Sequence, residues 1–199
     1  MASVVSTVVG IVSLAFATLQ VRWTDHARAS ITVVAAERQE EILECLDEGL
    51  EARLRFEARL CHRRSMWLDG CEDARSELHT VRFDEITESY RVVSDRLQDD
   101  TEPTAVGAPA KSEALRVVTT LHDMPLEFLA RERPDLLNAP DAYIQVRTIF
   151  VCRGSVNRTL AHLSRVITLG LVNAVEDRSS WSDFNLTAPA HQRGGGDER

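Results

Sequence analysis

The hydrophobic pattern begins with an uncharged apolar segment near the amino terminus. Residues 4–21 carry no charged side chain, and twelve of these eighteen residues are apolar. That length is about what a helix needs to cross a bilayer, and Arg22 and Trp23 follow it directly. The positive-inside rule places the part of the chain after these residues in the cytoplasm. We therefore expect a membrane anchor over residues 1–22 that contacts the lipid bilayer through residues 4–21, which makes the chain a single-pass membrane protein.

Two other interpretations of this segment stay open. Ala15-Phe16-Ala17 resembles a signal-peptidase site after an apolar run of suitable length, so the segment would be removed during export. The segment is also only moderately hydrophobic and contains several hydroxyl groups. These properties suit a helix that is buried in the core of a soluble protein.

Small residues recur along the same segment at spacings of three and four. Such a stripe lets two membrane helices approach closely. We therefore predict membrane-helix packing, and with it a homo-oligomer, through this face. The residues of the stripe are Ser6, Gly10, Ser13 and Ala17.

The body of the chain is predicted to be all-α. From residue 30 onward, leucines and isoleucines keep near-helical spacing with Glu and Arg opposite them, a pattern typical of an amphipathic helix or a coiled coil. Proline and glycine then interrupt the pattern before it resumes. We expect a long helix and a helical hairpin (23–97), a flexible linker (98–111), a C-terminal helical region that completes a small helical bundle (112–176) and a disordered tail (177–199).

Charge divides by sign along the expected long helix, with acidic residues first and arginines after them. Arg55, Arg59 and Arg63 are four residues apart, so a helix would present them as one stripe. A solvated helix face explains such a stripe without any partner. As functional alternatives, we predict that these arginines bind an acidic, unidentified protein partner or a phosphate-bearing ligand.

Composition limits the partners. The chain has 31 Asp plus Glu against 23 Lys plus Arg, a formal net charge of −8. This balance disfavours binding through overall charge to nucleic acid, and we expect none.

The cysteines and histidines give no clear chemistry. Cys61, His62, Cys71 and His79 are suitable zinc ligands, but their spacing matches no known zinc motif. We expect no metal and no cofactor. Four cysteines are too sparse for a disulfide scaffold in 199 residues, so we expect reduced thiols in the core; they are Cys45, Cys61, Cys71 and Cys152.

A search for catalytic motifs finds no phosphate-binding loop, dinucleotide fingerprint, nucleophile elbow or zinc-protease motif. The sequence therefore leans away from an enzyme without excluding one. Our main hypothesis is a membrane-anchored, cytoplasm-facing helical protein that acts by protein–protein interaction, as an adaptor or scaffold. The alternative is a soluble or peripheral helical ligand-binding protein or enzyme with a site between helices.

Overall fold

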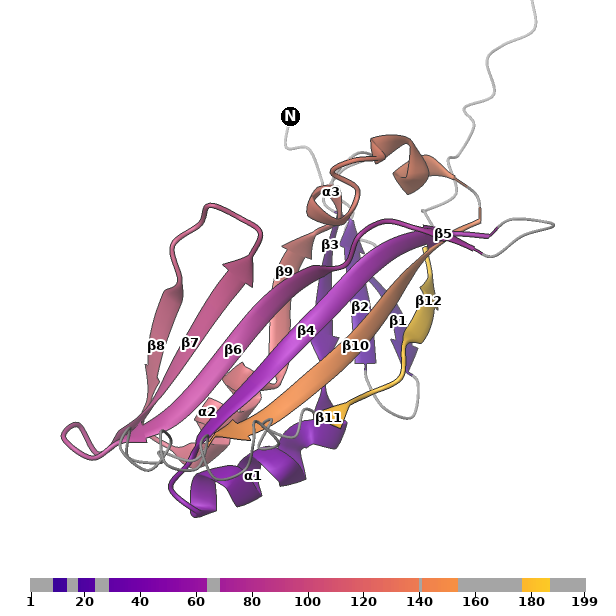
Figure 1. Ribbon diagram of the computed structural model, residues 1–199. Helices are drawn as coiled ribbons and strands as arrows, with labels where there is room; N and C mark the ends of the chain where they lie inside the picture. Colours follow the sequence, from indigo (N-terminus) through magenta and orange to yellow (C-terminus); the bar gives the residue numbers. More distant parts are fainter. Residues whose placement is uncertain are drawn as a thin grey trace, which may run out of the picture.

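The computed structural model describes residues 9–13, 18–23, 29–63, 69–139, 141–153 and 177–186. Strands make up 55% of these described residues and helices 21%. The strands form two antiparallel sheets, shown in Figure 1. The all-α prediction is therefore wrong, and with it the helical bundle and the coiled coil.

The large sheet has the strand order β11-β10-β4-β6-β7-β8, and two short strands, β5 and β12, pair with β4 and β10. Its long central strands are β4 and β10, which run antiparallel over twelve paired residues. The strands are β4 (Glu51–His62), β5 (Gly70–Cys71), β6 (Arg75–Asp84), β7 (Ser89–Leu97), β8 (Thr104–Ala108), β10 (Ala142–Arg153), β11 (Asp177–Arg178) and β12 (Ser182–Asn185).

The small sheet lies behind the large one in Figure 1. Its order is β1-β2-β3-β9, and its strands are β1 (Val9–Ser13), β2 (Thr18–Trp23), β3 (Ala29–Val34) and β9 (Thr120–Pro125). Ile31 and Val33 of β3 share one apolar core with Leu54 and Phe56 of β4. The two sheets therefore pack through their inner faces, and the other face of the large sheet points away from this core.

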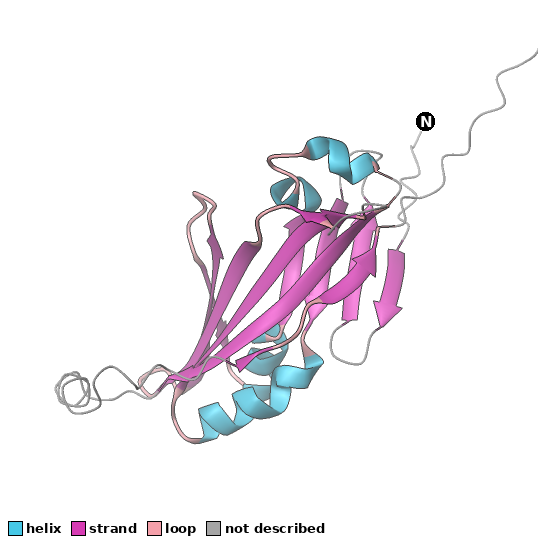
Figure 2. Cartoon of the chain, turned by 45° about the vertical axis from the view of Figure 1, so that its right-hand side comes forward, coloured by secondary structure: helices cyan, strands magenta, loops and turns pink. Residues whose placement is uncertain are grey.

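Helices close the two ends of the sheet pair (Figure 2). The 3₁₀ turn η1 (Ala36–Arg38), α1 (Gln39–Asp47) and α2 (Lys111–Val118) lie at one end, and α3 (Leu126–Leu129) with η2 (Pro134–Asn138) lies at the other.

The expected membrane anchor contributes strands to the small sheet. β1 and β2 pair antiparallel, with Gly10 opposite Val21 and Ser13 opposite Thr18. A Val-rich uncharged segment suits a strand as well as an apolar helix. In the part of the chain that the structure describes, no helix is both long and apolar enough to cross a bilayer. The prediction of a single spanning helix over residues 1–22 is wrong.

The stripe of small residues loses its basis for the same reason. Gly10 and Ser13 lie on β1, where the strand period replaces the helical spacing that defined the stripe. Ser6 and Ala17 lie outside the described residues.

The expected long helix ends at Gly49. Leu50 N–H donates to the carbonyl of Cys45 at 3.0 Å, and Gly49 N–H donates to that of Leu46 at 3.1 Å. These are the two hydrogen bonds of a Schellman motif. Gly49 has φ 71°, a conformation that glycine adopts without steric cost. Gly49 is thus the stop signal of α1, and the chain leaves it as β4.

β4 shows why the leucine spacing was ambiguous. Leu46, Leu50 and Leu54 are four residues apart, which is close to the helical period and is also a multiple of the strand period of two. The residues between the buried positions of β4 are almost all charged, and this alternation is typical of a half-buried strand. The fully buried positions are Ala52, Leu54, Phe56, Ala58 and Leu60.

The remaining helical predictions also become strands. β6 and β7 form a hairpin with a turn at residues 85–88, where the side chain of Ile86 is 94% exposed. β8 comes from the expected linker, and β11 and β12 come from the expected disordered tail. The region expected to be helical after residue 112 contains β9 and β10 besides α2 and α3. Residues 154–176 lie outside the described part.

Two disulfides replace the expected core thiols. Cys45 of α1 bonds to Cys152 of β10, 107 residues away, and Cys61 of β4 bonds to Cys71 of β5. No cysteine is free. The expectation of reduced thiols is wrong because sheet pairing brings together cysteines that lie far apart in the sequence.

Candidate functional site: an arginine face on the large sheet

The outer face of the large sheet gathers arginines from four strands. The alternation of β4 places its charged residues on this face, and the antiparallel register adds the matching positions of neighbouring strands. We call this surface the arginine face. Its arginines are Arg53, Arg55 and Arg59 of β4, Arg82 of β6, Arg91 of β7, and Arg147 and Arg153 of β10.

Two glutamates of β4 partly neutralise this face. Glu57 accepts hydrogen bonds at 2.7 Å from Arg147 Nε and lies 2.6 Å from Arg147 Nη2, and its other oxygen lies 3.4 Å from Arg55 Nε. Glu51 accepts from Arg53 Nε at 2.7 Å. For Arg82, Arg91 and Arg153, the described residues contain no carboxylate partner within ion-pair distance, so the face carries uncompensated positive charge.

An apolar groove of about 230 Å³ crosses the centre of this face. Arg55 pairs in register with Leu78 on one side and Ile149 on the other, so aliphatic side chains flank the arginine. Basic groups thus surround an aliphatic floor. The groove is lined by Arg53, Arg55, Leu78, Leu97, Ile149, Val151 and Arg153.

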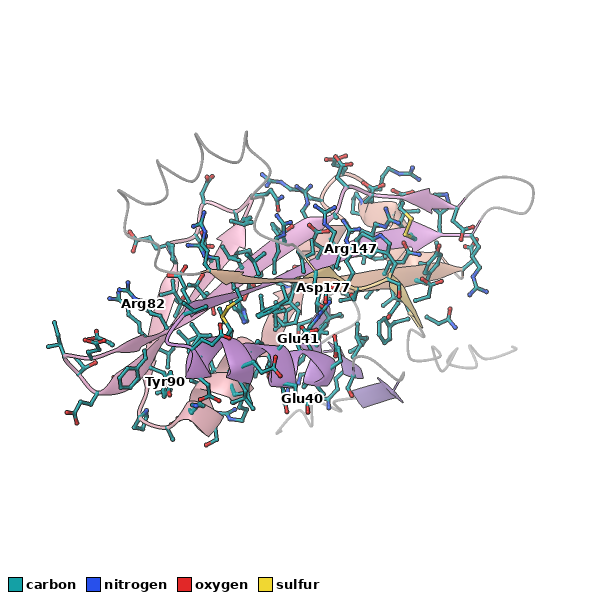
Figure 3. All side chains as sticks on the ribbon, turned by 60° about the horizontal axis from the view of Figure 1, so that its bottom comes forward. Glu40, Glu41, Arg82, Tyr90, Arg147 and Asp177 are labelled. Atoms are coloured by element: carbon teal, nitrogen blue, oxygen red, sulfur yellow. A yellow bond between two sulfur atoms is a disulfide. The ribbon has the colours of Figure 1, made fainter. Side chains whose placement is uncertain are left out.

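A second hollow of about 280 Å³ adjoins the groove. Arg53 of the groove pairs in register with Thr80, which lines the hollow, so the two share a border. Arg82 and Arg91 also line it, and Glu51 and Val93 complete the lining. In Figure 3, Arg82 lies toward the end of the molecule where the β6–β7 hairpin projects.

Aromatic side chains border the other end of the face. The guanidinium carbons of Arg59 and Arg147 each lie 4.3 Å from the centroid of Trp181, which is within cation–π range. Arg59 Nε also donates to Gln145 Oε1 at 2.8 Å. These contacts fix the two guanidinium groups before any ligand arrives.

Tyr143 closes this end. Its hydroxyl donates to Asp69 Oδ2 at 2.6 Å. Burial first, and then this hydrogen bond, raises the pKa of Tyr143 to about 12. Arg63 lies 5.6 Å from the centroid of the Tyr143 ring.

The predicted stripe of arginines is thus only partly at the groove. Arg55 lines it, Arg59 lies beside Trp181, and Arg63 follows the last residue of β4. Arg55 and Arg59 share a face although the helix was wrong, because a spacing of four is even. Sequence reasoning missed Arg147 and Arg153, and no local signal could place them, since β10 begins eighty residues after β4 ends.

A scan against family models matches residues 18–147, more than half of the chain, to a domain of unknown function, DUF4390. The chain belongs to the DUF4390 family. No curated protein and no solved structure matches it. The matched region of this DUF4390 protein includes every arginine of the face except Arg153, and it ends before Trp181.

A polar cluster holds β11 at the edge of this DUF4390 sheet. Arg38 is 4% exposed, and its Nη1 lies 2.6 Å from Asp177 and 2.7 Å from Glu41. Burial opposes the charge of Arg38, but these hydrogen bonds outweigh burial and raise its pKa; Arg38 in turn lowers the pKa of Asp177. Figure 3 shows Asp177 and Glu41 close to Arg147 in projection. The cluster is fully engaged in joining α1 to the sheet.

A second buried network lies on the inner face. His79, which is 2% exposed, contacts Glu77 Oε1 through Nε2 and the carbonyl of Val118 through Nδ1, each at 3.0 Å. Burial raises the pKa of Glu77, but His79 and Arg96 outweigh burial, so the net pKa of Glu77 is lowered. This network supports packing, because every member already has its partner.

The described residues contain no group of three or more His, Cys, Asp or Glu side chains that could hold a metal ion. Cys61 and Cys71, the thiols of the rejected zinc cluster, bond to each other.

Proposed function

We propose that this protein binds an anionic ligand that carries an apolar part, and that the groove of the arginine face is its site. The observation that carries the proposal is the lining of the groove, in which three arginines surround four aliphatic side chains. Such a lining suits a molecule with a carboxylate or phosphate group and a hydrocarbon portion. The proposal places the site on a sheet, in place of the site between helices that the sequence suggested.

In this groove, hydrogen bonds from the arginines and apolar contacts with the aliphatic floor strengthen each other. Side chains of Arg53 and Arg55 are only 33% and 31% exposed, so an anion beside them is partly removed from water. Charge-assisted hydrogen bonds from guanidinium to an oxyanion are short and geometrically specific. The aliphatic floor adds about 25 cal/mol for each Å² of apolar ligand surface that it covers.

Binding is the function that these groups support best. Arginines stay protonated at any physiological pH and therefore bind anions without exchanging protons. Glu77 is engaged with His79 and Arg96, and Glu41 and Asp177 are engaged with Arg38. The groove thus offers affinity and orientation for an anion.

The test uses decanoate below its micellar concentration, with decyltrimethylammonium as a cation of equal chain length. Calorimetric titration of the full chain should show binding of decanoate and none of the cation. Arg55→Gln should weaken decanoate binding by about tenfold or more, because a hydrogen bond to a charged group contributes about 1.5–3 kcal/mol.

The matched control is Arg131→Gln, which removes one exposed arginine outside the face. It should leave the affinity for decanoate unchanged. Equal weakening by both substitutions, or equal binding of the cation, would refute the groove as the site.

We also infer that the chain folds in an oxidising compartment. Both disulfides support this location, because cytosolic thiols are kept reduced. Protein from cells that retain it in the native compartment should resist thiol alkylation until a reductant is added. Thiols that react with the alkylating reagent before any reductant is added would contradict an oxidising compartment.

A further inference from the structure

Arg82 and Arg91 form a pair of like charges on neighbouring strands. They lie directly opposite each other in the β6–β7 register, both are exposed, and both line the second hollow. Cross-strand neighbours have Cβ atoms about 4.5–5.5 Å apart. Their two positive charges therefore share one small space.

This arrangement is unfavourable in the absence of a ligand. Like charges directly opposite each other on an antiparallel pair destabilise the sheet. Within the described residues, no carboxylate forms an ion pair with either arginine. Glu51 also lines the hollow, but it is paired with Arg53, whose Nε and Nη2 both lie 2.7 Å from its Oε1.

An oxyanion with two negative charges would remove the repulsion. Each guanidinium donates hydrogen bonds in a planar fork that matches phosphate oxygens. Thr80 adds a hydroxyl group to the same lining. A phosphate group can therefore accept hydrogen bonds from two arginines and from a hydroxyl. The repulsion between the phosphate and Glu51 is weakened, because that carboxylate is paired with Arg53.

We propose that Arg82 and Arg91 are a subsite for a phosphate-class dianion, and that the ligand of this protein is a phosphate ester with an aliphatic part. This inference rests on the proposed function, since the phosphate would occupy the hollow while the hydrocarbon lies in the adjoining groove. The shared border at Arg53 and Thr80 makes one continuous ligand sterically reasonable.

The first experiment measures the melting temperature of the full chain in inorganic phosphate at constant ionic strength, with chloride as the reference. Phosphate should raise the melting temperature of the wild type. In chloride, Arg91→Gln should melt about 1–3 °C higher than the wild type, because the repulsion is gone. The same variant should lose most of the rise in melting temperature that phosphate causes in the wild type.

This combination separates a binding subsite from a structural role. An arginine that merely stabilises the sheet would lower the melting temperature when it is replaced. Arg82→Gln should repeat both effects, and Arg131→Gln should show neither of them. The subsite is refuted if phosphate does not shift the wild type, or if Arg91→Gln keeps the full shift.

The second experiment compares inorganic phosphate with decyl phosphate below its micellar concentration. A phosphate ester as ligand predicts at least about tenfold tighter binding of decyl phosphate, since each buried methylene contributes about 0.8 kcal/mol. Arg91→Gln should weaken both probes. Equal affinity for the two probes would indicate that the ligand is free phosphate and would refute the proposal of a phosphate ester.

The two proposals fail separately. Binding of decanoate without any response to phosphate would retain the groove and refute the Arg82–Arg91 subsite. A phosphate response that depends on Arg91, without any binding of decanoate, would retain the subsite and refute the apolar groove.

Discussion

Glu57→Gln should change stability and ligand affinity in opposite directions. The Glu57 side chain is 12% exposed and contacts Arg147 at 2.6 and 2.7 Å and Arg55 at 3.4 Å. It is the acid that neutralises two arginines of the face. Glutamine keeps its size and one acceptor oxygen, so the substitution removes charge while it preserves most of the packing.

The stability cost follows from the lost ion pairs. Charge-assisted hydrogen bonds contribute about 1.5–3 kcal/mol when they are well buried. Arg147 and Arg55 are 25% and 31% exposed, so screening by solvent reduces this value. We expect a loss of about 1–2 kcal/mol, which lowers the melting temperature of a chain of this size by about 2–8 °C.

The affinity should rise because the removed charge repels the ligand. An anion that binds the far side of Arg55 lies about 7 Å from the Glu57 carboxylate, and Coulomb's law with a dielectric between those of water and a protein surface gives about 1 kcal/mol. That energy corresponds to about fivefold tighter binding of decanoate. The gain should shrink as salt is added.

Calorimetric titration with decanoate at low and high ionic strength measures this effect. Glu113→Gln is the matched control, because Glu113 is an exposed glutamate of α2, away from the face. It removes one negative charge and should leave the affinity nearly unchanged. Weaker or unchanged binding by Glu57→Gln would refute the reasoning, since the arginines next to Glu57 would then not contact the ligand.

Three further predictions concern stability and titration. Replacing the Cys45–Cys152 pair by alanine should lower the free energy of unfolding by about 5 kcal/mol, and replacing Cys61–Cys71 should lower it by about 3 kcal/mol. The difference arises because the closed loops span 107 and 10 residues. Urea denaturation that finds the larger loss for Cys61–Cys71 would contradict this. The pKa of Glu77 is lowered from its ordinary value of 4.5. Its ionised form therefore stabilises the fold fully above pH 4.5, and this stabilisation is lost as the pH falls through the lowered pKa. In acid denaturation, Glu77→Gln should lack part of this loss of stability. Tyr143→Phe should remove a phenolate absorbance step near pH 12, because burial and then Asp69 raise the Tyr143 pKa to about 12; a step that persists would contradict that assignment.

The sequence contained more of the fold than its helical interpretation used. Gly49 lies where a Schellman motif ends α1. The charged and apolar residues of β4 alternate strictly from Glu51 to Leu60, and no proline or glycine interrupts them. Weighting leucine spacing alone favoured a helix, because an interval of four fits both periods. Counting the alanines and Phe56 as core positions would have favoured the strand.

Other features could not be read from one sequence. The pairing of Cys45 with Cys152 and the meeting of Arg55 with Ile149 depend on the β4–β10 register. Registers between distant strands are set by the packing of the entire core and leave no local signal. Arg82 lies opposite Arg91 because residues 75–97 form a β-hairpin, and the prediction of helices over 23–97 excluded that pairing.

The central claim is that the groove of the arginine face holds the ligand. The most direct test is a titration of isotope-labelled protein with decanoate, followed by nuclear magnetic resonance of arginine Nε–H and methyl groups. The account predicts that the largest shifts occur at Arg53, Arg55, Leu78 and Ile149, which line the groove. Shifts that cluster on α1, α2 or the small sheet, with these four residues unchanged, would contradict it.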